Sequence, residues 1–273
     1  MVDIESAGIT DVGKKREGNE DSLFLDTEQN LYVVADGMGG HQAGEVASAL
    51  VVETIQDYMK RFAEEDEPEE MADMDESLSK EANRLLAGIR LANSAVYDIA
   101  KSKESYHGMG STVSAVYFTD DSVIVANVGD SPVYLVHDGN IELLSVIHNV
   151  ITEQMAINPE AAKTIGLSYR HMLTRAMGID ETVEPDVTEI QYFKGDMLVI
   201  CSDGLTDNVD PEEILEVIKR EAPEKACQTL VNLSNDRRGH DNITVITLKV
   251  RSTQDGKGGL LGWIKKILFP FKK

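Results

Sequence analysis

The sequence predicts a mixed α+β fold in which the helices are segregated from antiparallel sheet. Apolar residues recur at helical spacing in two long segments, 44–62 and 78–99, so each is expected to form an amphipathic helix. Short apolar runs divided by Asp and Gly turns fill residues 111–144, which is typical of an antiparallel meander. A last apolar run, 243–250, predicts a closing strand.

The composition is that of a soluble globular chain able to bury a sizeable core, with 273 residues, 42% hydrophobic and 27% charged. A formal net charge of −22 argues against a nucleic-acid partner and favours cations, because clustered carboxylates repel one another. Neither an export signal nor a disulfide framework is visible, so a cytoplasmic location is expected. The protein is also expected to be a monomer. The two cysteines, Cys201 and Cys227, are expected in the core.

The first strands are expected in SAGIT (6–10) and SLFLD (22–26), with an irregular polar stretch between them. The run LYVVA then predicts a strand that ends at Asp36. Asp-Gly at 36–37 could be a hairpin turn, but a glycine loop and a helix follow it, which favours a functional Asp36. Asp138-Gly139 has apolar alternation on both sides and is expected to be a hairpin turn.

Two segments lack a regular pattern. Residues 64–76 form an acidic block interrupted by proline and are expected to be a solvated, poorly ordered loop. Residues 145–178 show no strong strand pattern, so this long stretch is expected to be either functional or disordered. Strands are expected to resume at 187–193 and 195–205. Helices are expected to begin at Asp210, with a proline in its first turn, and at Pro223, the latter through Leu230.

Four aspartates stand at ends of apolar strands: Asp36, Asp130, Asp203 and Asp241. Each alone could be a turn former, but strand ends can converge at one rim of a sheet. Carboxylates gathered there would bind hard cations such as Mg²⁺ or Mn²⁺. Two ions sharing a carboxylate would activate a water and clamp a phosphate, which predicts phosphoryl hydrolysis.

Six motifs in order carry a family resemblance: RxxNED from Arg16, ADGMGGH, GMGST, ANVGDS, CSDGLTD and GHDN. Across almost all of residues 5–250 the chain resembles bacterial metal-dependent serine/threonine protein phosphatases, type 2C. The resemblance implies a four-layer α-β-β-α sandwich, two antiparallel sheets flanked by helices, with the metal centre at one end. It also implies a catalytic domain at 1–251 with a flap at about 145–178.

The same resemblance implies a role for each motif residue. Two Mn²⁺ or Mg²⁺ ions would be bridged by Asp36, with the carbonyl of Gly37 on the first ion and Asp203 and Asp241 on the second. Three further residues would act around them: Glu20 and Asp21 on metal-bound waters, and Arg16 on the substrate phosphate. A weaker third metal site would use Asp130 and Asp207 and share Asp203.

The implied reaction hydrolyses phosphoserine and phosphothreonine through a metal-bridging hydroxide, without a covalent phospho-enzyme. Cysteine-dependent phosphatases need Cys, five residues, then Arg, and neither cysteine fits this spacing. His41 is a candidate general acid, although Met38 stands where animal relatives have histidine and His41 could be purely structural. An inactive metal-binding module and a phosphatase of small molecules remain alternatives.

The sequence departs from the family pattern at Pro132, in place of an arginine, and at Ile147, in place of an aspartate. The stretch 147–168 aligns loosely, which leaves substrate choice open, although phosphoproteins and a cognate kinase are the expected partners.

After a glycine-rich linker, the tail within 252–273 is basic and amphipathic. It is expected either to lie on the inner face of the membrane or to dock on the acidic body or a neighbouring subunit.

Overall fold

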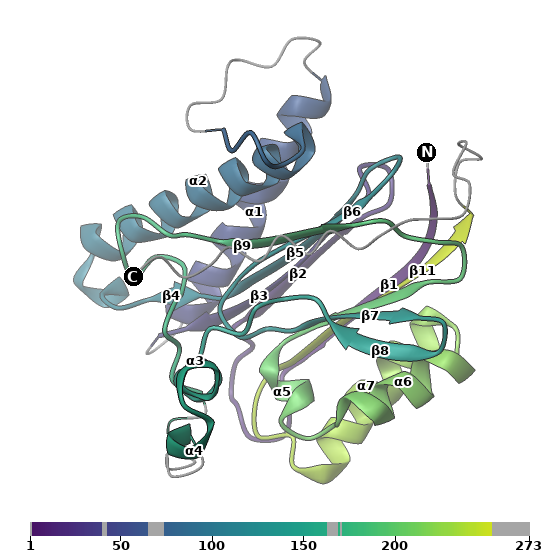
Figure 1. Ribbon diagram of the computed structural model, residues 1–273. Helices are drawn as coiled ribbons and strands as arrows, with labels where there is room; N and C mark the ends of the chain where they lie inside the picture. The colour runs from purple at the N-terminus through teal and green to yellow at the C-terminus, as the bar shows by residue number, and fades with distance from the viewer. Residues whose placement is uncertain (1, 40–42, 65–73, 163–168, 170, 253–273) are drawn as a thin grey trace.

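The computed structural model describes residues 2–39, 43–64, 74–162, 169 and 171–252. Two antiparallel sheets pack face to face, and helices cover the outer face of each sheet (Figure 1). The predicted four-layer α-β-β-α architecture is therefore confirmed.

The two sheets are built from strands distant in sequence. In the first sheet the strand order is β1 (Asp3–Asp11), β11 (Ile243–Ser252), β10 (Met197–Cys201), β7 (Val133–His137) and β8 (Asn140–Leu143). In the second sheet the order is β2 (Asp21–Asp26), β3 (Leu31–Met38), β5 (Val113–Phe118), β6 (Val123–Val128) and β9 (Asp186–Ile190), and β4 (Gly110–Ser111) pairs with β3. All these pairs are antiparallel.

The helices form two outer layers. The second sheet is covered by α1 (Ala43–Glu64) and α2 (Lys80–Ser102), after which a short 3₁₀ helix, η1 (Glu104–Tyr106), leads to β4. The first sheet is covered by α5 (Asp203–Thr206), α6 (Pro211–Arg220) and α7 (Pro223–Arg237). Two further helices, α3 (Val150–Ile157) and α4 (Pro159–Ala162), stand beside the sandwich (Figure 1).

The first five residues of β3, LYVVA, form an apolar run with no alternating polar positions. Leu31, Val33 and Ala35 face the core beneath α1 and α2. Tyr32 and Val34 face the core between the two sheets. Because both faces of the strand are buried, the usual alternation of apolar and polar residues is absent.

Several local expectations hold. Asp138 and Gly139 have φ of +49° and +80° and connect β7 to β8 as a hairpin. Asp210 and Glu213 form a capping box at the start of α6, with Pro211 in its first turn. Both cysteines are free and buried in the core beneath α6 and α7.

The predicted single meander over 111–144 is wrong. Strands β5 and β6 pair in the second sheet, whereas β7 and β8 pair in the first, so the chain crosses between sheets after Val128. Gly129 makes this crossing possible, since its φ of +104° strongly favours glycine. A Cβ at this position would also lie 2.6 Å from a Thr112 methyl carbon.

Other element boundaries also need correction. The stretch 145–178 contains helices α3 and α4, which short length and weak amphipathicity hid from the sequence pattern. Helix α7 continues to Arg237 instead of ending at Leu230, and β1 is longer than SAGIT. The strand expected over 195–205 ends at Cys201, and α5 begins at Asp203. The predictions for His41, for most of the acidic block and for the tail fall on residues outside those described. Within the described residues, no helix is both long and apolar enough to cross a membrane.

Candidate active site

A cavity of about 520 Å³ gathers most of the residues that the motifs singled out. It lies at the end of the sandwich where β3 and β10 finish and β11 begins. The predicted site residues that line it are Arg16, Glu20, Asp36, Gly37, Asp130, Asp203 and Asp241. The predicted convergence of strand-end aspartates is therefore observed.

Backbone segments around Glu20 and Gly44 pack closely against Asp36 and Gly37 and fix their positions. The Gly37 amide donates to the Glu20 carbonyl over 3.0 Å, and the Asp36 amide donates to Thr112 Oγ1 over 3.0 Å. A Cβ at Gly37 would lie 2.1 Å from the Gly44 carbonyl oxygen. The start of α1 can therefore approach β3 only because residue 37 is glycine.

The carboxylates form a strongly negative group. Burial raises the pKa of Asp36 well above its ordinary value, and the nearby charges of Asp21, Asp203, Asp241 and Asp130 raise it further. Burial likewise raises the pKa of Asp21 and of Asp130 to about 7. A bound cation would offset this repulsion and favour the ionised carboxylates.

Asp21 provides a second indication that the carboxylates suit a cation. It is 7% exposed, and its Oδ2 accepts hydrogen bonds from Ser202 Oγ at 2.8 Å and Thr244 Oγ1 at 2.7 Å. Its Oδ1 is buried and makes no hydrogen bond with any residue in the described part of the chain. An orphaned oxygen among clustered carboxylates fits a hydrated divalent cation, because such ions prefer oxygen ligands.

Arg16 brings positive charge to the rim of the cavity. Its Nη2 lies 2.9 Å from Asp241 Oδ2, and its Nη1 lies 3.9 Å from Glu20 Oε2. The hydrogen bond with Asp241 raises the pKa of the guanidinium. About half of the side chain is exposed, so Arg16 can meet an anion that enters from solvent.

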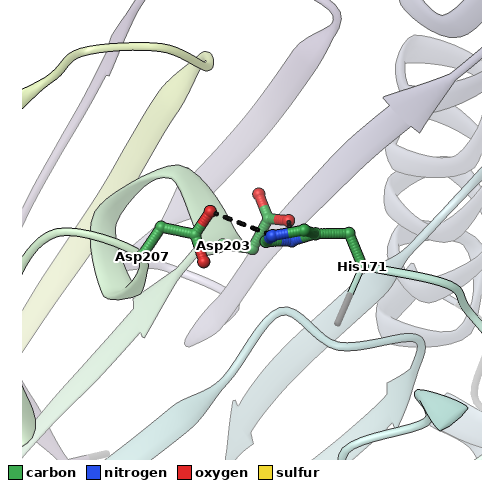
Figure 2. Close-up of side chains that lie close together, drawn as sticks. All are labelled: His171, Asp203 and Asp207. Atoms are coloured by element: carbon green, nitrogen blue, oxygen red, sulfur yellow. Dashed lines mark hydrogen bonds and ion pairs between the residues drawn. The ribbon is translucent and has the colours of Figure 1, made fainter. Parts of the chain in front are cut away.

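His171 was not predicted as a site residue, and it contacts two of the predicted ligands. Figure 2 shows its ring close to the carboxylates of Asp203 and Asp207. Nδ1 lies 3.3 Å from Asp203 Oδ2, and Nε2 lies 3.6 Å from Asp207 Oδ2. The hydrogen bond with Asp203 is the main cause that raises the pKa of His171 to about 9. The only signal in the sequence is its place in YRHMLTRAMG, where the family pattern resumes.

Asp186 ties both ends of the segment 145–178 to β9. His148 Nε2 lies 2.8 Å from Asp186 Oδ2, and Arg175 Nη1 donates to the same oxygen over 2.6 Å. Arg175 also lines the cavity. The segment expected to be a flap is therefore anchored at its two ends beside the site.

Residues 14–239 match the family model described as protein phosphatase 2C. The chain belongs to the protein phosphatase 2C family. This membership confirms the resemblance, and with it the enzyme class expected from the sequence, a protein phosphatase.

Individual relatives align with this chain over nearly their whole length. A serine/threonine phosphatase, stp, of Listeria monocytogenes is 33% identical over 255 residues, covering 91% of this chain and 96% of that protein. The crystal structure of the Mycobacterium tuberculosis serine/threonine phosphatase PstP/Ppp superposes with a TM-score of 0.78 at 30% identity, covering 92% of this chain and 100% of that chain. The catalytic domain of PstP in complex with two manganese ions gives a TM-score of 0.76 at 31% identity, covering 91% and 99%.

Proposed function

We propose that this protein phosphatase uses divalent metal ions to hydrolyse phosphoserine and phosphothreonine in proteins. The observation that carries the proposal is the gathering of Asp36, Asp130, Asp203 and Asp241 in one cavity with Arg16 at its rim. An inactive interaction module is not favoured, because the predicted ligands of the first two metals and the predicted phosphate-binding residue meet at this cavity.

The donor set supports two Mn²⁺ or Mg²⁺ ions. Asp36 and the Gly37 carbonyl would hold the first, and Asp36, Asp203 and Asp241 the second; Asp130, Asp203 and Asp207 would hold a weaker third. When bound, such ions lower the pKa of a water and polarise phosphoryl oxygens. The catalytic domain of the related phosphatase PstP was crystallised with two manganese ions, which supports the choice of Mn²⁺ here.

The chain's own side chains would bind the substrate and order water. Arg16 presents a guanidinium, which suits two phosphate oxygens at once and keeps its charge at any working pH. Its contact with Asp241 holds it beside the carboxylates before substrate arrives. Glu20 and Asp21 would orient the waters bound to the metal ions. His41 is proposed as the proton donor to the leaving oxygen, on its sequence position alone.

The wider setting is also a proposal. Residues 1–251 would form the catalytic domain, with a flap at about 145–178, and the protein would act as a cytoplasmic monomer on phosphoproteins and a cognate serine/threonine kinase. The basic tail within 252–273 would give any membrane contact, at the inner face, through its lysines and its apolar residues.

The deciding experiment is phosphate release from a phosphothreonine peptide by purified protein after chelation, with Mn²⁺, Mg²⁺ or Ca²⁺ added back separately. Metal-dependent release is expected, and competition by a small phosphorylated molecule tests the small-molecule alternative. A folded protein that is silent with every ion would support the inactive alternative.

A further inference from the structure

A second cavity, of about 330 Å³, lies at the opposite end of the sandwich. The β2–β3 turn supplies Asn30, α1 supplies Met59, α2 supplies Glu81 and Arg84, and the end of β5 supplies Tyr117. Strand β3 begins at this end and finishes in the active site, so its eight residues separate the two cavities by roughly 25 Å. This cavity is therefore separate from the active-site cavity and shares no lining residue with it.

Two residues that line this cavity each carry a buried polar atom that has no hydrogen-bond partner among the described residues: Asn30 Oδ1 and Arg84 Nε. Asn30 is 8% exposed and has a φ of +55°, and its carbonyl accepts from the Phe118 amide over 3.0 Å, so the turn holds it in place. The Arg84 guanidinium lies 5.0 Å from the centre of the Phe62 ring. Buried polar atoms are almost always paired, which points to a ligand at this position.

The cavity wall defines the chemistry of that ligand. Arg84 Nε offers a donor and Asn30 Oδ1 an acceptor, so the ligand must supply one group of each kind. Three carboxylates, of Glu28, Glu81 and Asp120, also line the cavity. They would repel an anion such as phosphate, and an anion would leave Asn30 Oδ1 unpaired. A peptide with a lysine fits, because its carbonyl accepts from Arg84 and its ammonium donates to Asn30 and the carboxylates.

We propose that this cavity is the docking site for the chain's own basic C-terminal segment, residues 260–273. From Thr253 onward the chain carries net charge +4, which leaves −26 on the rest, so the two parts attract each other. The apolar residues of the segment also match the Met59 and Tyr117 side chains in the cavity wall.

The chain length allows this docking. Strand β11 ends at Ser252, which pairs with Asp3 at the start of β1. This end of β11 lies away from Asp241 and the active site, at the same end of the sandwich as the β2–β3 turn. The seven residues 253–259 can span up to roughly 25 Å when extended. That reach exceeds the spacing of about 20 Å from one sheet across the other to the outer helices.

Trp263 lies in the docking segment and is the only tryptophan of the chain, so its fluorescence reports the segment alone. The test measures acrylamide quenching of full-length protein and of two charge reversals, Glu81→Lys in the cavity wall and Glu53→Lys at an exposed position on α1 that does not line it. Circular dichroism and phosphate release from a short peptide verify that each variant is folded.

We expect Trp263 to be shielded in the wild type at every protein concentration, and the quenching constant to rise severalfold in Glu81→Lys but not in Glu53→Lys. Four results would overturn the proposal. These are full quenching in the wild type, shielding that survives Glu81→Lys, shielding that appears only with vesicles containing phosphatidylserine, and shielding that grows with protein concentration. The last two would assign the segment to a membrane surface or to a second copy of the chain.

Discussion

His171 Nδ1 lies 3.3 Å from Asp203 Oδ2, which joins the segment 145–178 to a carboxylate expected to serve two metal sites. The other ring nitrogen is 3.6 Å from Asp207 Oδ2, so one imidazole contacts two proposed ligands of the third metal. The pKa of about 9 means that this ring carries a positive charge near neutral pH. A metal ion that binds Asp203 and Asp207 must compete with that charge.

His171→Gln is therefore expected to strengthen metal binding. Removing a half-exposed ion pair should lower the apparent Kd for Mn²⁺ at the weakest site by about two- to fivefold. Isothermal titration calorimetry of the chelated protein measures the change. His107→Gln, at an exposed position in the loop after η1, is the control and should leave the Kd unchanged. Weaker binding in His171→Gln would instead show that the imidazole is itself a ligand.

Asp36→Asn is expected to abolish both Mn²⁺ binding and phosphate release, because the buried amide cannot replace a shared anionic ligand. The chain contains a matched control in the Asp138-Gly139 pair. Asp138→Asn makes the same chemical change in an exposed hairpin, where asparagine tolerates the positive φ of +49°. Calorimetry and a phosphopeptide assay should separate the two variants completely. Normal turnover by Asp36→Asn would refute the assignment.

Arg16→Ala is expected to weaken substrate capture more than turnover. Loss of charge-assisted hydrogen bonds to phosphate should lower kcat/KM by about ten- to a hundredfold, mainly through KM. Arg16→Lys should recover only part of this, since an ammonium does not bind two phosphate oxygens as a guanidinium does. Arg90→Ala, which breaks the exposed Arg90–Glu184 ion pair, is the control and should leave kinetics unchanged. A purely kcat effect would place Arg16 elsewhere in the reaction.

Local sequence patterns predicted individual helices and strands, but they did not predict which sheet each strand joins. Helices α1 and α2 match the helical spacing of 44–62 and 78–99, and β3 matches the apolar run LYVVA, because burial of each apolar face determines both pattern and element. The strand predicted to end at Asp36 continues to Met38. The division of 111–144 between two sheets was not predictable in this way. Each strand would show the same pattern in either sheet, and only Gly129 marks the crossing.

The site residues also divide into those that local sequence predicts and one that depends on tertiary contacts. The aspartates could be predicted because strand ends place them, and the motifs add Arg16, Glu20 and Gly37. His171 could not, since it reaches Asp203 from a segment whose path depends on tertiary contacts such as those of Asp186. A lone histidine without a regular spacing gives no sign of which carboxylate it will meet.

Asp186→Asn is expected to loosen that segment and to change the pH dependence of stability. Burial raises the pKa of Asp186, but hydrogen bonds and charges from His148 and Arg175 outweigh burial, so the folded pKa lies below the ordinary 3.8. A carboxyl with a lowered folded pKa stabilises the fold above its unfolded pKa, and this stability is lost as pH falls through the folded value. After allowance for solvent screening, the loss at pH 7 should be about 1 to 2 kcal/mol.

Urea unfolding of the wild type and Asp186→Asn from pH 7 down to pH 3 measures this effect. The difference in free energy of unfolding should be constant above about pH 5 and should shrink below about pH 4 as the wild-type carboxylate takes up a proton. Asp121→Asn, at an exposed turn, is the control and should show no gap at any pH. KM for a phosphopeptide should rise in Asp186→Asn, because Arg175 lines the active-site cavity and would lose its partner. A gap that widened on acidification would mean that Asp186 is held protonated, contrary to the direction of its pKa.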